Sequence, residues 1–272
     1  MTAGPIGVDD VLLVVDVGNT RIKLAAVADL GAGRRLPALT HRQDLASREF
    51  RSDNLARWLR VAAPGPAVVL VAGVHETAAA RVEAVIAELS GTAAHRLRRR
   101  RVVHTDLPLT VRVPEPGRVG IDRLAGAAAA AVIRDPGRPA IVVDCGTATT
   151  VDLISAAGEF LGGAILPGPR LLARALAEGT SRLPEVANLE TGSPPEMPGT
   201  STQAAIAAGI GWGMRGAVAR LVAEARGRLG DASVILTGGS RGVIRDALPG
   251  AAELPDLVLA GIALAAASAR GR

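Results

Sequence analysis

The chain contains almost no aromatic residues and very little cysteine. Its 272 residues include two Phe, two Trp, no Tyr and one Cys. With so few rings, the core must be packed by aliphatic side chains, and binding of nucleic-acid bases by stacking is disfavoured. A single cysteine excludes an internal disulfide and is typical of a reducing compartment. We expect Cys145 to be a small buried residue and not a nucleophile.

Signals for a membrane or for export are also missing. The longest apolar runs are too short and too rich in Ala and Gly to span a bilayer. The first ten residues lack a basic start followed by an apolar stretch, which a signal peptide would have. We therefore expect a cytoplasmic protein with no membrane partner.

Positive charge is carried almost entirely by arginine, because Lys23 is the only lysine. The net charge is +5, and the densest basic segment is His95–Arg101. A basic patch can attract nucleic acid, but this segment has no interleaved aromatic residues. We expect a solvated, arginine-rich surface and no nucleic-acid partner. Attraction of an anionic substrate is an alternative use of the same segment.

The two commonest nucleotide-binding loops are absent. The chain has no Gly-x4-Gly-Lys-Ser/Thr motif and no Gly-x-Gly-x-x-Gly after a strand. It has instead one short pattern twice, in Asp16-Val-Gly-Asn-Thr20 and in Asp144-Cys-Gly-Thr-Ala-Thr149. In each copy an apolar β-run ends on Asp, and a Gly-containing turn leads into a second β-rich run.

This pattern suits the binding of Mg²⁺ and phosphate. Glycine lets the backbone approach an oxygen closely, the outward N–H groups of the turn can bind phosphate, and the carboxylate can bind the metal. One copy alone fits an ordinary hairpin turn equally well. Two copies at matching places in two similar halves favour a nucleotide site.

The elements around these turns also repeat. After two initial strands, the elements expected in the first half are a strand at Ala38–His41, a helix at Asp44–Ala62, a strand at Ala67–Ala72, a helix at Glu76–Leu89 and β-runs at Val102–His104 and Leu109–Val113. Those expected in the second half are strands at Ala140–Val143, Thr150–Ile154 and Glu159–Leu166, helices at Arg170–Ala177 and Thr202–Leu229, a strand at Ser233–Leu236 and a terminal helix.

Three β-runs followed by alternating helices and strands predict an α/β fold with mixed sheets covered by helices. Pro114–Gly117 is the strongest break between the halves. We therefore expect two like domains, residues 1–117 and 118–272, that face a central cleft with the two acidic turns at its floor.

Gly120-Ile-Asp-Arg123 opens an alanine-rich helix just after this break. An Asp at a helix start commonly caps free N–H groups and no more. Here Arg123 adds a cation for a carboxylate or phosphate, and the hinge position would place both residues at the cleft. We expect Asp122 to accept the proton of a substrate hydroxyl as it attacks a γ-phosphorus.

The first turn is expected to hold Mg·ATP. Asp16 would bind Mg²⁺, the turn from Gly18 to Thr20 would bind phosphate, and Lys23 would place a charge near the transferred phosphoryl group. Thr237-Gly-Gly-Ser240 follows an apolar strand and fits two interpretations. It is either a turn against which adenine lies or an ordinary strand-to-helix turn.

In their order and spacing, these motifs resemble those of the type III pantothenate kinases from about residue 11 to residue 265. The motifs that carry the resemblance are Asp16–Lys23, Gly120–Arg123, Asp144–Asp152, Gly162–Gly168, Leu183-Pro184, Ser201–Ile206 and Thr237–Gly239. The resemblance implies the actin-like, sugar-kinase-like fold of two ribonuclease-H-like domains. It also implies ATP-dependent phosphorylation of the primary hydroxyl of pantothenate to 4'-phosphopantothenate, the first step of coenzyme A biosynthesis.

The resemblance further implies a role for each matching residue. Asp122 would be the base, Asp144 would bind a monovalent cation (K⁺ or NH₄⁺), and Thr202 would contact pantothenate across a homodimer interface. The residues implied to contact ATP are Asp16, Val17, Gly18, Asn19, Thr20, Arg21, Ile22, Lys23 and Thr147. Those implied to contact pantothenate, besides Thr202, are Gly120, Ile121, Asp122 and Arg123.

Two positions depart from the family pattern. The family often has a Tyr shortly before the Gly-x-Asp-Arg motif, and here Val113 stands near that place. Ser201 replaces the usual Asn before Thr202. One alternative function is therefore a kinase of the same fold that acts on another small hydroxylated acid. Another is a catalytically silent nucleotide-binding regulator, which the presence of all three acids disfavours.

Overall fold

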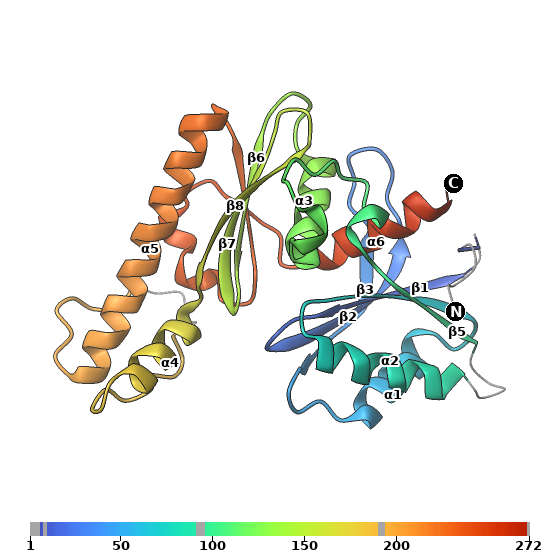
Figure 1. The fold of residues 1–272 in the computed structure, drawn as a ribbon, viewed down its shortest axis with the longest axis horizontal. Helices are drawn as coiled ribbons and strands as arrows, with labels where there is room; N and C mark the ends of the chain where they lie inside the picture. Colours follow the sequence, from blue (N-terminus) through green and yellow to red (C-terminus); the bar gives the residue numbers. More distant parts are fainter. Residues whose placement is uncertain (1–5, 8–9, 91–95, 190–193, 271–272) are drawn as a thin grey trace. The chain divides into compact units, whose positions relative to one another are not determined.

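The computed structural model describes residues 6–7, 10–90, 96–189 and 194–270 (Figure 1). His95 and most of the N-terminal segment considered above lie outside these residues. Contacts divide the chain into two compact units. Unit 1 comprises Met1–Ile133 together with Leu257–Arg272, and unit 2 comprises Arg134–Asp256.

Unit 1 contains a five-stranded mixed sheet in the order β3-β2-β1-β4-β5. β1, β2 and β3 are antiparallel neighbours, whereas β4 and β5 run parallel to β1. The strands are β1 (Val11–Val17), β2 (Arg21–Asp29), β3 (Ala38–Ala46), β4 (Ala67–Gly73) and β5 (Leu97–Arg101). The helices are α1 (Ser52–Ala62), α2 (Glu76–Ser90), α3 (Ile121–Ile133) and α6 (Leu257–Arg270).

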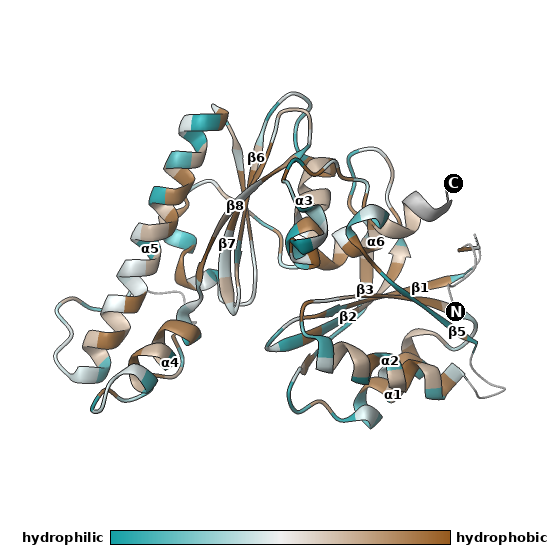
Figure 2. Ribbon diagram, viewed as in Figure 1, coloured by the Kyte–Doolittle hydropathy of each residue, from teal (hydrophilic) through white to brown (hydrophobic). Residues whose placement is uncertain are grey.

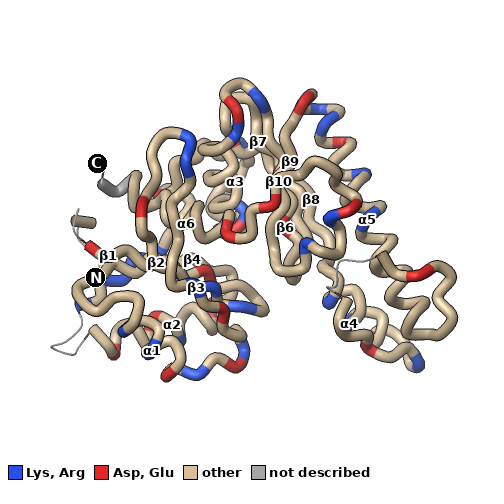
Figure 3. The backbone as a smooth tube through the Cα atoms, turned by 180° about the vertical axis from the view of Figure 1, so that it is seen from behind, with Lys and Arg blue, Asp and Glu red and all other residues tan. Residues whose placement is uncertain are grey.

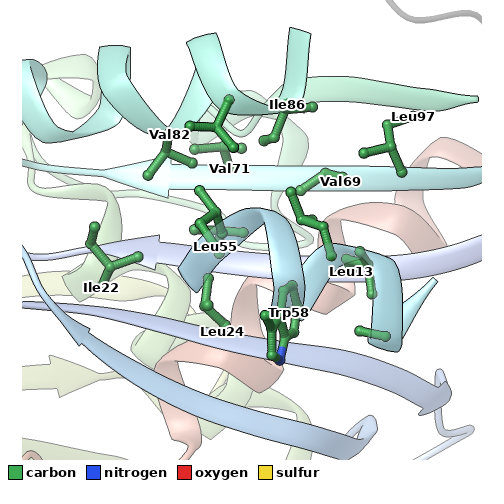
Figure 4. Packing of buried hydrophobic residues seen from close by; sticks show 14 of the residues in the cluster. Leu13, Ile22, Leu24, Leu55, Trp58, Val69, Val71, Val82, Ile86 and Leu97 are labelled. Atoms are coloured by element: carbon green, nitrogen blue, oxygen red, sulfur yellow. The ribbon is translucent and has the colours of Figure 1, made fainter. Parts of the chain in front are cut away.

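Helices α1 and α2 cover one face of this sheet (Figure 1). Alternate residues of β1 and β4 face them, and the side chains of Leu13, Leu55 and Ile86 are fully buried in the cluster between sheet and helices. Figure 4 shows part of this cluster, with Leu13, Ile22, Leu24, Leu55, Trp58, Val69, Val71, Val82, Ile86 and Leu97 labelled. Each such burial stabilises the fold by about 1.5–3 kcal/mol, so aliphatic packing suffices without many rings.

The other face of the sheet is covered by α3 and α6, which pack closely against each other. A Cβ on Gly261 of α6 would lie only 1.9 Å from the carbonyl oxygen of Ala125 on α3. The alanine-rich sequence of α3 thus serves a close helix-to-helix contact, because larger side chains would separate the two backbones.

Unit 2 contains a second five-stranded sheet in the order β10-β9-β6-β7-β8. Its strands are β6 (Ala140–Cys145), β7 (Ala148–Ile154), β8 (Phe160–Pro167), β9 (Ser233–Thr237) and β10 (Ala252–Glu253), and its helices are α4 (Pro169–Gly179) and α5 (Thr202–Leu229). One face packs against α5, with Val143, Cys145 and Met214 buried between them. The expectation that Cys145 is a small buried residue is confirmed.

The two sheets have the same topology. In each, three antiparallel strands come first in the chain, and the next two strands add in parallel beside the first of the three. This repeat confirms the predicted α/β fold with two mixed sheets. The compact units differ in extent from the expected domains 1–117 and 118–272, because α3 and α6 both pack with the sheet of unit 1.

The basic segment differs from its expected structure. The β-runs expected at Val102–His104 and Leu109–Val113 are not strands, and the edge strand β5 is formed by the arginines themselves. Figure 2 shows β5 as a hydrophilic strand. Each arginine of the strand is paired with a carboxylate, in the pairs Arg98–Asp10, Arg99–Glu83, Arg100–Asp106 and Arg101–Glu76.

These pairs neutralise the segment locally, which weakens the case for it as a site for anions. Figure 3 likewise shows acidic and basic residues interspersed along the chain. The helix expected from Asp44 begins later, at Ser52, because β3 continues to Ala46. Within the ranges described above, no helix has both the length and the apolar character needed to cross a bilayer.

Candidate active site

The first acidic turn joins β1 to β2 in unit 1. Asp16 lies one residue before the end of β1 and is directly opposite Lys23 in the antiparallel ladder, so both side chains are on the same face of the sheet. Asp16 is 7% exposed, Lys23 is half-buried, and the turn residues Asn19 and Thr20 are exposed. The arrangement places a carboxylate and an ammonium group side by side at the base of an open turn.

Ser47, which follows β3, holds this turn from the side. Its hydroxyl donates to the carbonyl oxygen of Gly18 at 2.7 Å, and its backbone N–H donates to the carbonyl oxygen of Thr20 at 3.0 Å. The N–H of Gly18 donates to the carbonyl oxygen of Arg21 at 2.9 Å. Ser47 is 1% exposed. It therefore fixes the backbone of the predicted phosphate turn, a role that its sequence position did not suggest.

The Gly-x-Asp-Arg segment lies near the same edge of the sheet. The N–H of Val74, just after β4, donates to the carbonyl oxygen of Val17 at 3.1 Å. A Cβ on Gly120 would lie 3.7 Å from Cγ1 of Val74. The start of α3 thus packs on the residue that follows β4, beside the end of β1.

Asp122 is half-buried in the first turn of α3. Its Oδ1 accepts a hydrogen bond from the backbone N–H of Arg123 at 2.9 Å. A Cβ on Gly120 would lie 2.5 Å from that same oxygen. Asp122 therefore satisfies one free N–H of the helix, as a capping residue would, while its position beside the β1–β2 turn leaves the catalytic interpretation open.

The second acidic turn joins β6 to β7 in unit 2. The N–H of Gly146 donates to the carbonyl oxygen of Ala148 at 2.9 Å, and Thr147 at the tip is exposed. Gly168 packs against this turn, since its N–H donates to the carbonyl oxygen of Thr147 at 2.9 Å. A Cβ on Gly168 would lie 2.1 Å from the carbonyl oxygen of Gly146. The Gly-rich segment 162–168 thus shapes the turn.

The Thr237–Ser240 turn approaches Asp144 from another side. Gly238 has φ +94°, and its missing Cβ would lie 2.4 Å from Oδ1 of Asp144 and 2.3 Å from the carbonyl oxygen of Cys145. The N–H of Ser240 donates to that carbonyl oxygen at 2.8 Å. Only glycine permits this approach, which brings the backbone of the Thr237–Ser240 turn against the carboxylate of Asp144.

Thr150 stands directly opposite Asp144 in the β6–β7 ladder, on the same face of the sheet. It is 9% exposed, and its Oγ1 has no hydrogen-bond partner within the part of the chain that the structure describes. Burying a hydroxyl without a partner costs about 1–3 kcal/mol. The cost indicates that a group not present in the structure completes this site.

These residues fit a singly charged cation better than a protein-built divalent site. Over the described residues, no group of three or more His, Cys, Asp or Glu side chains could hold a metal ion. The donors nearest each other in the ladder are the Asp144 carboxylate and the neutral hydroxyl of Thr150, beside a backbone wall that a Cβ would fill. The buried carboxylate of Asp152 lies two residues further along β7, opposite Val142. At Asp16 a single carboxylate suits Mg²⁺ that keeps most of its ligands as water and phosphate oxygens.

Thr202, the first residue of α5, borders a cavity of unit 2. The cavity has a volume of about 660 Å³, and Thr202 is the only residue of its lining with a polar side chain. The lining residues are Leu166, Pro167, Leu172, Leu176, Leu183, Thr202, Ala205, Ile206, Gly209, Ile210, Gly213, Met214 and Ala217. Because Pro167 precedes Gly168, one end of the cavity lies next to the Thr147 turn.

The structure therefore brings the predicted residues together in two groups. In unit 1, the turn Asp16–Lys23 and the segment Gly120–Arg123 lie at one edge of a sheet. In unit 2, Asp144 and Thr147 lie on a single turn. Sequence reasoning singled out neither Ser47, which lies in no local motif, nor Thr150, which lies within the Asp144–Asp152 motif but is related to Asp144 only by the register of β6 and β7.

Residues 12–224 match the family model described as type III pantothenate kinase. The chain belongs to this family. A type III pantothenate kinase of Rhodopirellula baltica is 38% identical over 265 residues, which cover 90% of this chain and 94% of the relative. Both the predicted family and the predicted kinase class are thereby confirmed, and neither alternative function is favoured.

Solved structures with the same fold are more distant in sequence. One is a putative transcriptional activator of the Baf family from Campylobacter jejuni, with a TM-score of 0.55 and 19% identity over 92% of this chain and 94% of that one. Another is a putative 2-dehydro-3-deoxygalactonokinase from Sinorhizobium meliloti, with a TM-score of 0.54 and 18% identity over 94% and 95% of the two chains. These likenesses concern the fold alone, and they agree with the predicted sugar-kinase-like architecture.

Proposed function

We propose that this chain transfers the γ-phosphoryl group of ATP to the primary hydroxyl of pantothenate, forming 4'-phosphopantothenate at the start of coenzyme A biosynthesis. Membership of the type III pantothenate kinase family supports this function. The observation that carries it to particular residues is that Gly120, in contact with Asp122, packs on Val74, whose N–H donates to the carbonyl oxygen of the last residue of β1 before the β1–β2 turn. This packing joins a candidate base to a candidate phosphate-binding turn within one compact unit.

Asp122 is the proposed base. Its carboxylate would take the proton of the attacking hydroxyl, while Arg123 would hold the substrate carboxylate or the charge that develops during transfer. The hydrogen bond from the Arg123 N–H to Oδ1 leaves Oδ2 of Asp122 to meet the substrate. Gly120 and Ile121 would contact pantothenate through the backbone that precedes the base.

The β1–β2 turn is the proposed site for the terminal phosphates of ATP. Gly18, Asn19 and Thr20 would surround the phosphates, and Arg21 would continue the wall of the site along β2. Val17 and Ile22, whose side chains are buried in the cluster under α1 and α2, would contribute only backbone. Lys23 would add a point charge beside Asp16, its partner across the ladder. Asp16 would hold Mg²⁺, which when bound neutralises charge on the transferred group.

The Asp144 turn is the proposed site of a monovalent cation, K⁺ or NH₄⁺, with Thr147 contacting phosphate. The orphaned hydroxyl of Thr150 and the backbone wall at Gly238 support a cation there. When bound, such a cation supplies positive charge near the phosphates without proton exchange. An absence of nucleic-acid partners and a cytoplasmic location stay predictions.

A homodimer is proposed from the apolar cavity of unit 2. Its lining is almost wholly aliphatic, and Leu171 of α4, next to the lining residue Leu172, is 42% exposed. Exposed apolar surface of this kind is typical of an interface. A second copy that covers α4 and α5 would bring Thr202 to the pantothenate site of its partner.

The test is the release of ADP in the presence of pantothenate, measured for the natural chain and for Asp122→Asn. We expect Asp122→Asn to lose at least 10²-fold in kcat, because the amide cannot accept the proton, while circular dichroism and the unfolding midpoint stay close to those of the natural chain. Near-normal kcat in this variant would remove Asp122 from the mechanism.

A panel of acceptors tests the substrate separately. Pantothenate should be phosphorylated with a higher kcat/KM than other small hydroxylated acids. Activity with another acid and none with pantothenate would contradict the proposed substrate, and it would connect Val113, where relatives often have Tyr, with a changed acceptor site. The matched control for the Asp122→Asn variant described above is Asp53→Asn, which alters an acid in the first turn of α1 that no step of the reaction uses.

A further inference from the structure

The hydroxyl of Thr150 is the one buried polar side-chain atom on the Asp144 face of the second sheet that lacks a partner, over the residues that the structure describes. Native proteins rarely leave such a group unsatisfied, and each exception calls for an explanation. The backbone of Thr150 is paired with neighbouring strands on both edges of β7, with β6 on one side and β8 on the other. The strand pairing therefore fixes the direction of the Cα–Cβ bond of Thr150, and the side chain is buried at 9% exposure.

The position of Thr150 relates it to one residue in particular. Directly opposite residues of an antiparallel pair have Cβ atoms about 4.5–5.5 Å apart, and Thr150 is opposite Asp144. On the other side of Asp144, the parallel strand β9 places Thr237 in register with it. The hydroxyl of Thr237 donates to the carbonyl oxygen of Pro255 at 3.4 Å. Of the two threonines that flank Asp144, only Thr150 has a hydroxyl with no hydrogen-bond partner among the described residues.

The surroundings favour a small cation over a bulky ligand. Gly238 brings its backbone so close that a Cβ would lie 2.4 Å from Oδ1 of Asp144, and Gly163 approaches β7 so closely that a Cβ would lie 2.1 Å from the carbonyl oxygen of Val151. A hydroxyl oxygen with free lone pairs coordinates cations as well as it accepts hydrogen bonds. The carboxylate of Asp144 with the neutral hydroxyl of Thr150 balances a single positive charge, whereas the buried Asp152 lies further along β7, opposite Val142, and has an interaction of its own.

We propose that Oγ1 of Thr150 is a direct oxygen ligand of a monovalent cation held beside Asp144. This inference rests on the assignment of a cation to Asp144 made under the proposed function, and it adds a second protein ligand from the neighbouring strand. Two ligands on paired strands would make cation affinity depend on the β6–β7 register and not on the turn alone.

The experiment measures thermal unfolding of the full chain, without nucleotide or pantothenate, as KCl replaces choline chloride at constant ionic strength. A cation that binds only the folded chain raises the unfolding temperature saturably, so the titration gives a half-saturating concentration of K⁺. We expect Thr150→Val to raise this concentration at least tenfold. Thr150→Ser, which keeps the hydroxyl, should change it less than threefold.

The control is Thr149→Val, which changes the adjacent residue on the opposite face of the sheet. The hydroxyl of Thr149 donates to Sγ of Cys145 at 3.5 Å, so its removal should lower the unfolding temperature without moving the half-saturating concentration of K⁺. Thr150→Val removes an unsatisfied hydroxyl and keeps the shape of the side chain. Without K⁺, its unfolding temperature should therefore equal or exceed that of the natural chain.

Asp144→Asn separates this inference from the one on which it depends. If Asp144→Asn abolishes the K⁺ response and Thr150→Val leaves it intact, the cation site stands and the role of Thr150 is overturned. If the natural chain shows no saturable response to K⁺ or NH₄⁺, or if Asp144→Asn leaves that response intact, the cation assignment itself fails. A loss in Thr150→Val that Thr150→Ser restores supports the proposal.

Discussion

A Cβ atom on Gly120 would lie 2.5 Å from Oδ1 of Asp122, so the glycine decides how closely the backbone approaches the candidate base. The atom that would be displaced is the far end of a side chain, and a carboxylate can rotate away without disturbing α3. A methyl group at position 120 therefore acts on the orientation of Asp122 more than on the fold.

We expect Gly120→Ala to lower kcat for pantothenate phosphorylation by about 10²-fold, because misplacing a reacting group by about 1 Å has an effect of this size. Steady-state kinetics and a thermal unfolding curve measure the two effects side by side. Gly117→Ala is the matched control, since its Cβ would make an ordinary 3.5 Å contact with Cε1 of His104. Equal activity in both variants would show that the orientation of Asp122 does not limit the reaction.

Ser47→Ala should weaken ATP binding. The substitution removes the hydrogen bond to the carbonyl oxygen of Gly18 and loosens the β1–β2 turn, so we expect KM for ATP to rise several-fold with kcat less affected. The free energy of unfolding should fall by about 1–3 kcal/mol, because a part-buried carbonyl loses its partner.

Ser90→Ala provides a comparison with a similar loss of stability. The hydroxyl oxygen of Ser90 lies 2.7 Å from the carbonyl oxygens of both Ile86 and Leu97 and donates its one hydrogen to either of them, far along the sheet from the turn. This variant should lose stability with KM for ATP unchanged. A rise in KM for ATP in both variants would mean that general destabilisation, and not the turn, is responsible.

Gly261→Val should destabilise unit 1 by roughly 3 kcal/mol or more, because a Cβ there would lie 1.9 Å from the carbonyl oxygen of Ala125 and the two helices must move apart. Urea unfolding measures the change. In contrast, Gly227→Ala on α5 meets nothing within 4 Å and should stabilise by up to about 1 kcal/mol through helix propensity. A tolerated valine at position 261 would contradict the close packing of α3 and α6.

Glu253 should contribute a small, pH-dependent stability to unit 2. The hydrogen bond from Arg245 lowers the pKa of Glu253 from its ordinary value of 4.5, burial opposes this shift, and Arg241 adds to the lowering. Arg241 in turn donates to the carbonyl oxygen of Gly238 at 3.0 Å. The pair thus supports the turn that faces Asp144.

Because the pKa is lower in the folded chain than in the unfolded one, the contribution is complete above the unfolded pKa and is lost as the pH falls through the folded value. We expect Glu253→Gln to lower the free energy of unfolding by less than about 1 kcal/mol at pH 7. The difference should shrink below about pH 4.5. In an Arg245→Gln background the same substitution should matter less, and an undiminished effect there would contradict the pairing.

The long helix α5 shows how far local signals reach. The sequence predicts it over Thr202–Leu229, and the structure has the same bounds. Its start is a local cap, because the side chain of Ser201 accepts from the N–H of Ala204. Its end is Gly230, which adopts a positive φ of 80°. Both signals lie within a few residues of the helix they delimit.

The basic strand β5 shows where such reasoning fails. Five residues, Leu97–Arg101, form an edge strand although four of them are arginines. Their charges are balanced by acids from other parts of the chain, such as Asp10 and Glu83, which sequence proximity does not indicate. Burial of Leu97 and parallel pairing with β4 then outweigh the weak local preference.

The sequence by itself determined the two acidic turns, the Gly-x-Asp-Arg segment and the family, because each is a short pattern of strand, glycine and charge whose parts are covalently close. Only the tertiary structure decided that Ser47 clamps the first turn, that Thr150 faces Asp144, and that α6 returns to unit 1. Ser47 and α6 contact elements far from them in the chain, and Thr150, although close to Asp144 in sequence, is placed opposite it by the register of β6 and β7. Strand register and helix packing are not encoded by local spacing.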